Sequence, residues 1–159
     1  MKIIYSPIGT IYTPYQKIVG MPIQPSGAVG VRGTIEILPQ YVAGLKDLSG
    51  FSHLVLLYHF DRATDHKMIV TPFLDIEPRG LFATRAPRRP NPIGLSVVKL
   101  LSVDNNILEI ENVDILDGTP LLDIKPYVPD FDSAPNVEVG WLERVRGEVR
   151  KKKADDRFR

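Results

Sequence analysis

The segment Gly94–Ile115, GLSVVKLLSVDNNILEIENVDI, holds two runs rich in Val, Ile and Leu on either side of a polar triplet. Such runs favour β-strands, because branched side chains fit the pleated surface of a sheet. The triplet Asp-Asn-Asn at 104–106 tolerates the positive φ angles of a tight hairpin turn. The segment therefore predicts two antiparallel strands, Gly94–Val103 and Ile107–Ile115.

The same pattern recurs on the N-terminal side of this hairpin. Further candidate strands, each bounded by turn residues, are Ile8–Tyr12, Val29–Leu38, Ser52–Phe60 and Phe73–Thr84. Fourteen prolines and twelve glycines leave little room for long helices. Short helices are predicted at Tyr41–Leu48, whose apolar residues have helical spacing, and around Trp141 and Leu142.

Short antiparallel strands at this spacing favour a closed barrel or a sandwich. Strand–helix alternation is missing, which argues against a parallel α/β sheet. The glycines of Gly27–Gly33 run into a β-branched stretch instead of a helix, so they predict a turn or bulge and not a Rossmann fingerprint. We expect an all-β fold: a small antiparallel β-barrel with one or two short helices.

The chain has 159 residues and no cysteine. Its length suits one compact domain, and the missing thiols exclude disulfides and zinc sites built on sulfur. No apolar run is long enough to span a membrane, and the N-terminus lacks the features of a signal peptide, so we expect a cytoplasmic protein.

The net charge of +1 hides a basic C-terminus. Residues 144–159 hold eight Lys or Arg and three Asp or Glu, a local charge of +5. Such a segment is able to touch nucleic acid phosphates, but a solvated, partly disordered terminus is the simpler interpretation. We therefore divide the chain into a barrel domain, 1–143, and a basic tail, 144–159.

The histidines do not predict a metal site. His53 and His59 share one face of a candidate strand, but six residues at roughly 3.3 Å each separate them by roughly 20 Å. His66 lies in a polar loop. Neither H-E-x-x-H nor G-x-S-x-G occurs, so zinc hydrolase and serine hydrolase chemistry are unsupported.

The segment Ala83–Ser96, ATRAPRRPNPIGLS, carries more charge than a structural loop needs. Its arginines alternate with prolines, which fix φ and so present the side chains on a stiffened loop. The polar residues presented are Arg85, Arg88, Arg89 and Asn91. Guanidinium groups suit carboxylates and phosphates, so we interpret this loop as an anion-binding loop. The alternative is a rigid loop with solvated arginines.

The segment Asp114–Tyr127, DILDGTPLLDIKPY, contains a strong turn signal at 117–120. Around that turn, several polar side chains lie close enough in sequence to face one pocket. They are Asp114, Asp117, Asp123, Lys125 and Tyr127. Surface charges on a loop are an equally good explanation of the same residues.

Four stretches together resemble the TsaA-like family, in particular its TrmO-type tRNA N6-methyltransferases. They are PIGTIYTPY (Pro7–Tyr15), FSHLVLLYHF (Phe51–Phe60), GLFATRAPRRPNPIGLS (Gly80–Ser96) and LDGTPLLDIKPY (Leu116–Tyr127). The resemblance implies a non-Rossmann β-barrel methyltransferase. It further implies a homodimer that binds S-adenosylmethionine near the subunit interface and methylates N6 of threonylcarbamoyladenosine beside the tRNA anticodon.

The resemblance also implies roles for individual residues. Cofactor contacts would fall at Pro25, Ser26, Gly27, Asp61, Arg62, Arg85, Leu95, Asp114, Ile115, Leu116 and Asp117. Among these, Arg85 suits the methionyl carboxylate, and Asp117 suits the ribose diol. The tRNA anticodon loop would meet Arg88, Arg89, Asn91 and Lys125, and Asp123 and Tyr127 are the candidates for handling the N6 proton.

Two alternatives stay open at this point. A methyltransferase of the same fold would act on a different acceptor, because fold alone does not determine function. A non-catalytic module would bind S-adenosylmethionine or RNA as a sensor. Neither interpretation requires a metal ion or a membrane.

Overall fold

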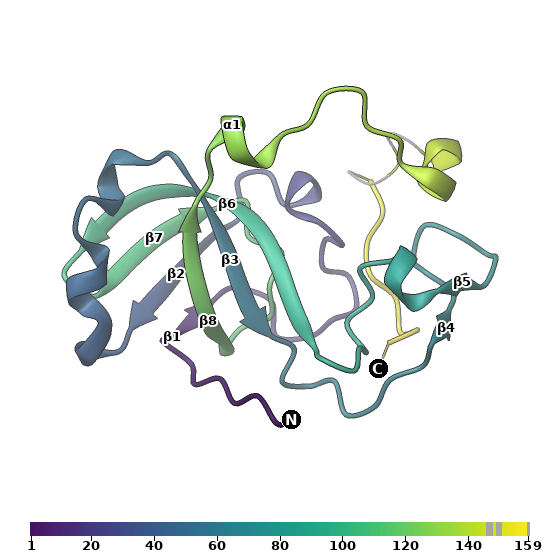
Figure 1. Cartoon of the computed structure of the whole chain (residues 1–159), viewed down its shortest axis with the longest axis horizontal. Coiled ribbons are helices and arrows are strands. Elements are labelled where there is room, and N and C mark those ends of the chain that lie inside the picture. Colours follow the sequence, from purple (N-terminus) through teal and green to yellow (C-terminus); the bar gives the residue numbers. More distant parts are fainter. Residues whose placement is uncertain (146–147, 149–150, 159) are drawn as a thin grey trace.

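The computed structural model describes residues 1–145, 148 and 151–158. Six antiparallel strands close into a barrel in the order β1-β2-β7-β6-β3-β8, with β8 pairing back onto β1 (Figure 1). The strands are β1 (Gly9–Tyr12), β2 (Arg32–Ile37), β3 (His53–His59), β6 (Ile93–Asp104), β7 (Ile107–Glu111) and β8 (Thr119–Pro126). The expected all-β barrel is confirmed.

The core fills the inside of this barrel. Alternate residues of β3 point inward and are buried, whereas the residues between them, including both histidines of the strand, are only partly buried. The fully buried side chains of the core include Ile11, Ile35, Leu54, Leu56, Val98, Leu108, Ile110 and Leu121. Burial of these aliphatic side chains supplies the main stabilising contribution to the fold.

The hairpin between β6 and β7 is confirmed. Asp104 pairs with Ile107, and Asn105 adopts a φ of 52° in the turn between them. The second strand stops at Glu111, earlier than predicted, because Asn112 has a φ of 65° and turns the chain out of the ladder. Residues 113–115 therefore lie beyond the strand.

The predicted strand Phe73–Thr84 is wrong. Only β5 (Arg79–Gly80) is extended there; it pairs with β4 (Ile69–Val70) and leads into the 3-10 turn η4 (Leu81–Ala83). The Asp75 carboxylate accepts the backbone N–H groups of Ile76 and Glu77, which makes a tight turn in place of a strand. Residues 69–89 form a side arm next to the barrel (Figure 1).

Strand β8, which contains Pro120 and Pro126, was not predicted, because the turn signal at 117–120 suggested a loop. Both prolines lie near the strand ends. Tyr41–Leu48 is helical as expected, but as the 3-10 helices η2 (Pro39–Leu45) and η3 (Leu48–Gly50), interrupted where Asp47 has a φ of 66°. The remaining short elements are η1 (Pro25–Gly27), α1 (Pro129–Asp132) and η5 (Gly140–Val145), a 3-10 helix where a short helix was predicted around Trp141 and Leu142.

The described end of the basic tail is not a solvated terminus. Residues 151–158, the C-terminal segment, run back beside the side arm (yellow in Figure 1). Ala154 donates its N–H to Met21 O and accepts the Gly20 N–H, both at 2.8 Å. The Phe158 ring is buried and packs edge-on against Phe73 at a centroid distance of 5.0 Å. Apolar burial and backbone pairing thus outweigh the charge of this segment. No helix among the described residues has the length and apolar character that crossing a membrane requires.

Candidate functional site

A cavity of about 740 Å³ lies where one end of the barrel meets the side arm and the C-terminal segment. This volume is typical of a site for a small molecule or cofactor. The barrel contributes Tyr58 at the end of β3, Gly94 at the start of β6 and Asp114 beyond β7. Segments far apart in the sequence therefore meet at a single site.

The barrel side of the cavity contains a buried hydrogen-bond chain. The Ser96 hydroxyl donates to Asp114 Oδ1 at 2.6 Å, and the Tyr58 hydroxyl lies 3.0 Å from the same Ser96 oxygen. Burial raises the pKa of Asp114 to about 6, although Ser96 and the nearby Arg85 favour its charged form. A carboxyl group that titrates near neutrality thus lines the cavity.

Two arginines of the predicted set also line the cavity. Arg85 is exposed, and its guanidinium donates to Gln24 Oε1 at 3.2 Å. Arg62 donates to Gln16 O at 3.0 Å and to Asp117 O at 3.2 Å, which ties the loop after β3 to the turn before β8. Arg85 is therefore the arginine better placed to meet an anionic ligand.

Most of the predicted cofactor residues meet at this cavity. Those that line it are Asp61, Arg62, Arg85, Leu95, Asp114, Ile115 and Leu116. Pro25, Ser26 and Gly27 form η1 directly after Gln24, which does line it. Asp117 lies outside the cavity lining. Its carboxylate accepts hydrogen bonds from Thr13 N–H and Gln16 Nε2, both at 2.9 Å, and these bonds lower its pKa.

Two arginines of the loop Ala83–Ser96 are engaged in contacts within the protein. Arg89 lines the cavity, but its Nη1 donates to three backbone carbonyl oxygens, of Leu81, Thr84 and Ala86. Arg88 forms an ion pair with Asp65 at 3.0 Å. Asn91 is exposed outside the cavity lining.

Asp123, Lys125 and Tyr127 lie outside the cavity lining. A bulge in β8 turns Asp123 and Lys125 to the outer face of the barrel, where they form an ion pair at 2.7 Å. Tyr127 follows β8, and its ring lies 6.4 Å from that of His53, at the far end of β3 from Tyr58. The described residues hold no group of three His, Asp or Glu placed to bind a metal ion.

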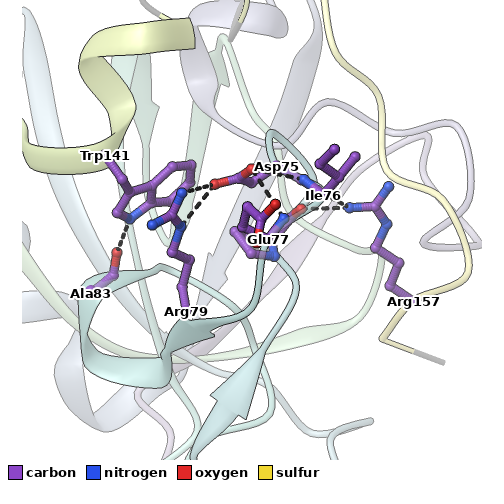
Figure 2. Close-up of polar contacts among 8 residues, drawn as sticks. Asp75, Ile76, Glu77, Arg79, Ala83, Trp141 and Arg157 are labelled. Carbon is purple, nitrogen blue, oxygen red and sulfur yellow. Dashed lines mark hydrogen bonds and ion pairs between the residues drawn. The ribbon is translucent and has the colours of Figure 1, made fainter.

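The aromatic side of the cavity was not predicted from the sequence. It is lined by Phe73, Phe82, Trp141 and Phe158. Figure 2 shows the Arg79 guanidinium beside the Trp141 indole, with Trp141 Nε1 donating to Ala83 O at 2.8 Å. Phe82 belongs to a stretch predicted to be a strand, and Phe158 belongs to a tail predicted to be solvated. The local sequence therefore did not indicate that either ring lines the cavity.

Residues 10–133 match the family model described as the tRNA-methyltransferase O N-terminal domain. A probable S-adenosyl-L-methionine-binding protein of Pyrococcus abyssi is 52% identical over 99% of this chain and 86% of its own length. The tRNA (adenine(37)-N6)-methyltransferase of Escherichia coli is 34% identical over 87% of this chain and 63% of its own length.

Solved structures agree with the observed architecture. A crystal structure of TrmO from Pseudomonas aeruginosa superposes with a TM-score of 0.75 at 40% identity, covering 89% of this chain and 63% of that one. This chain therefore spans less than two thirds of the length of that crystallised protein and of the Escherichia coli relative.

Proposed function

This chain belongs to the tRNA-methyltransferase O family, and from that premise we propose that it methylates N6 of threonylcarbamoyladenosine next to the tRNA anticodon, using S-adenosyl-L-methionine. The observation that carries the proposal is the cavity, which gathers seven of the eleven expected cofactor residues from separate segments. Relatives named as S-adenosyl-L-methionine-binding proteins and as tRNA methyltransferases support it.

The side chains of the cavity fit this cofactor chemically. Arg85 offers a guanidinium to a carboxylate, and Leu95 and Ile115 offer apolar contact to an adenine. Asp114 contributes a carboxyl group whose negative charge would favour a sulfonium. Bound there, the cofactor supplies an electrophilic methyl group.

The contribution of the chain to catalysis is then mainly positioning. In-line transfer of a methyl group requires donor and acceptor to be aligned, and holding both in one cavity supplies much of the rate. The Ser96 hydroxyl fixes the Asp114 carboxyl, the stiff loop 87–92 holds Arg89 at the cavity wall, and Gln24 accepts a hydrogen bond from Arg85.

We also propose that the protein is a homodimer, with Asp123 and Tyr127 handling the N6 proton. Both residues lie outside the cavity of their own chain, so this role requires a site shared by two subunits. Ile93 and Leu95 of β6 are 40% and 44% exposed and also line the cavity, so a second subunit packed against them would lie beside the bound cofactor. Lys125 and Asn91, which both lie outside the cavity lining, would contact the tRNA. A tRNA substrate would place the protein in the cytoplasm.

The deciding experiment incubates the protein with methyl-labelled S-adenosyl-L-methionine and tRNA that carries or lacks the threonylcarbamoyl group, followed by nucleoside analysis. We expect label only in the modified tRNA. Transfer to another nucleoside would indicate a different acceptor, and cofactor binding without any transfer would indicate a sensor. Light scattering tests the homodimer separately.

A further inference from the structure

The two sides of the cavity differ in chemistry. The barrel side carries the polar groups, including the Asp114 carboxyl and the buried Tyr58 hydroxyl. The opposite side, built by the side arm, η5 and the C-terminal segment, carries four aromatic rings, of Phe73, Phe82, Trp141 and Phe158, together with Arg85 and Arg89. A cavity with one polar and one aromatic side is suited to two ligands, or to two chemically distinct parts of a complex.

The aromatic side is open to a large ligand. Phe82 keeps 71% of its surface exposed, whereas Phe158 is buried behind Phe73. Cations lie close to two of the rings: Arg89 Cζ is 5.8 Å from the centroid of the exposed Phe82, and Arg79 Cζ is 5.5 Å from that of the partly buried Trp141. Aromatic rings interleaved with arginines are typical of surfaces that stack unpaired bases.

The charge around this side complements a nucleic acid. Lys151, Lys152 and Lys153 are exposed and directly precede Ala154, which lines the cavity. Their ammonium groups are therefore available to phosphates next to a base held at the rings.

A network of polar contacts holds these pieces together. Asp75 accepts two hydrogen bonds from Arg79, at 2.8 and 2.6 Å, and its backbone carbonyl accepts one from Arg157 at 3.1 Å (Figure 2). Arg79 in turn lies over Trp141. The side arm, η5 and the C-terminal segment are thus joined into a preorganised wall.

We propose that this aromatic wall binds the acceptor adenine of the RNA substrate, with Phe82 as the main stacking surface and Phe158 as a positioning residue behind Phe73. This inference rests on the proposed function and adds the acceptor subsite to it. The cofactor occupies the barrel side of the cavity and reaches Arg85 of the side arm, and the unstacked base enters at the exposed ring of Phe82.

The test uses an anticodon stem-loop with 2-aminopurine in place of the acceptor adenosine, because stacking on an aromatic ring quenches this fluorophore. The full-length wild-type protein is expected to quench it in the presence of S-adenosylhomocysteine. Phe82→Ala and Phe82→Leu should weaken binding about tenfold or more and abolish the quench, whereas Phe82→Tyr should retain both. Phe131→Ala is the control, because Phe131 is 82% exposed on α1 and outside the cavity lining.

Calorimetry with S-adenosyl-L-methionine separates the two sides of the cavity. Unchanged cofactor affinity in Phe82→Ala is expected. A loss of cofactor affinity, binding of the stem-loop as tight as in wild type, or a wild-type protein that does not quench the probe would each overturn the base site. Quenching of the probe combined with no methyl transfer to tRNA that carries the threonylcarbamoyl group, measured separately because 2-aminopurine has no N6, would instead refute the proposed function and leave the base site standing.

Discussion

The ring of Tyr58 lies directly against the backbone of Gly94, its partner across the β3–β6 ladder. A Cβ atom placed on Gly94 would come within 2.2 Å of Tyr58 Cε2, far closer than carbon atoms approach one another. Because Gly94 has no side chain, the Tyr58 ring fits against its backbone, and the Tyr58 hydroxyl reaches Ser96. The polar side of the cavity depends on this glycine.

Gly94→Ala should consequently displace Tyr58. We expect a loss of about 1–3 kcal/mol in the free energy of unfolding, as for other overpacked sites, together with weaker cofactor binding. Denaturant unfolding and calorimetry measure the two effects. Gly44→Ala is the matched control, because nothing lies within 4 Å of a Cβ at that position. Equal stability of the two variants would contradict the argument.

Asp114→Asn should change how stability depends on pH. The native pKa of Asp114, about 6, lies above its unfolded value of 3.8. Between these values the unfolded chain loses a proton that the native state keeps, so the free energy of unfolding falls as pH rises through this window. Relative to Asp114→Asn, the wild type should lose up to roughly 3 kcal/mol between pH 4 and 7. The free energies of unfolding of both proteins are measured in urea at each pH. If the two pH profiles run parallel, the raised pKa of Asp114 is contradicted.

Arg85→Ala should weaken S-adenosyl-L-methionine binding about tenfold or more, because a charge-assisted hydrogen bond to the ligand carboxylate is lost. The thermal midpoint should change little, since Arg85 is exposed. Calorimetry measures the affinity. Arg32→Ala serves as the control, with a side chain 74% exposed and outside the cavity lining. An unchanged dissociation constant in Arg85→Ala would contradict the proposed contact between Arg85 and the cofactor carboxylate.

Arg89→Ala should destabilise the fold more than Arg88→Ala. Removing Arg89 leaves carbonyl oxygens in the loop without their donor, at about 1–3 kcal/mol, whereas the partly exposed pair of Arg88 with Asp65 is worth at most about 1 kcal/mol. Thermal unfolding of both variants checks the order. A stable Arg89→Ala protein that binds tRNA weakly would return Arg89 to a phosphate-binding role.

Phe158→Ala should release the C-terminal segment while leaving the barrel folded. The ring contact with Phe73 would be lost, and with it the backbone bonds between Ala154 and the loop at 20–21. Hydrogen exchange should show lost protection at the Gly20 and Ala154 amides and unchanged protection in β3 and β6. Retained protection at Ala154 would mean that backbone pairing alone holds the segment.

The fold was largely predictable where local pattern and tertiary structure agree. The β6–β7 hairpin follows from apolar runs around Asn105, because that turn needs no distant partner. The errors arose where distant contacts decide. Residues 73–84 have strand-like composition, but the Asp75 turn and the contacts of its loop with Arg157 keep them from pairing as a long strand.

Part of the cavity lining was predictable in a similar way. Arg85 and Asp114 belong to short sequence segments that were predicted to contribute to the site, and both residues line the cavity. Phe158 and Trp141 reach the cavity only through contacts with residues far away in sequence, such as Phe73 and Ala83. The position of Asp123 outside the cavity also depends on a distant contact, because a bulge in the pairing of β8 with β3 sets the face on which Asp123 lies.

Closure of the barrel between β1 and β8 sets an order of events in folding. Gly9 pairs with Leu121, more than 100 residues later, so the ring of strands stays open until Thr119–Leu121 has left the ribosome. Until then, β1 and β3 each present an unpaired edge that is able to pair with other chains. Aggregation during synthesis, more than instability of the finished barrel, is therefore the hazard that this topology creates.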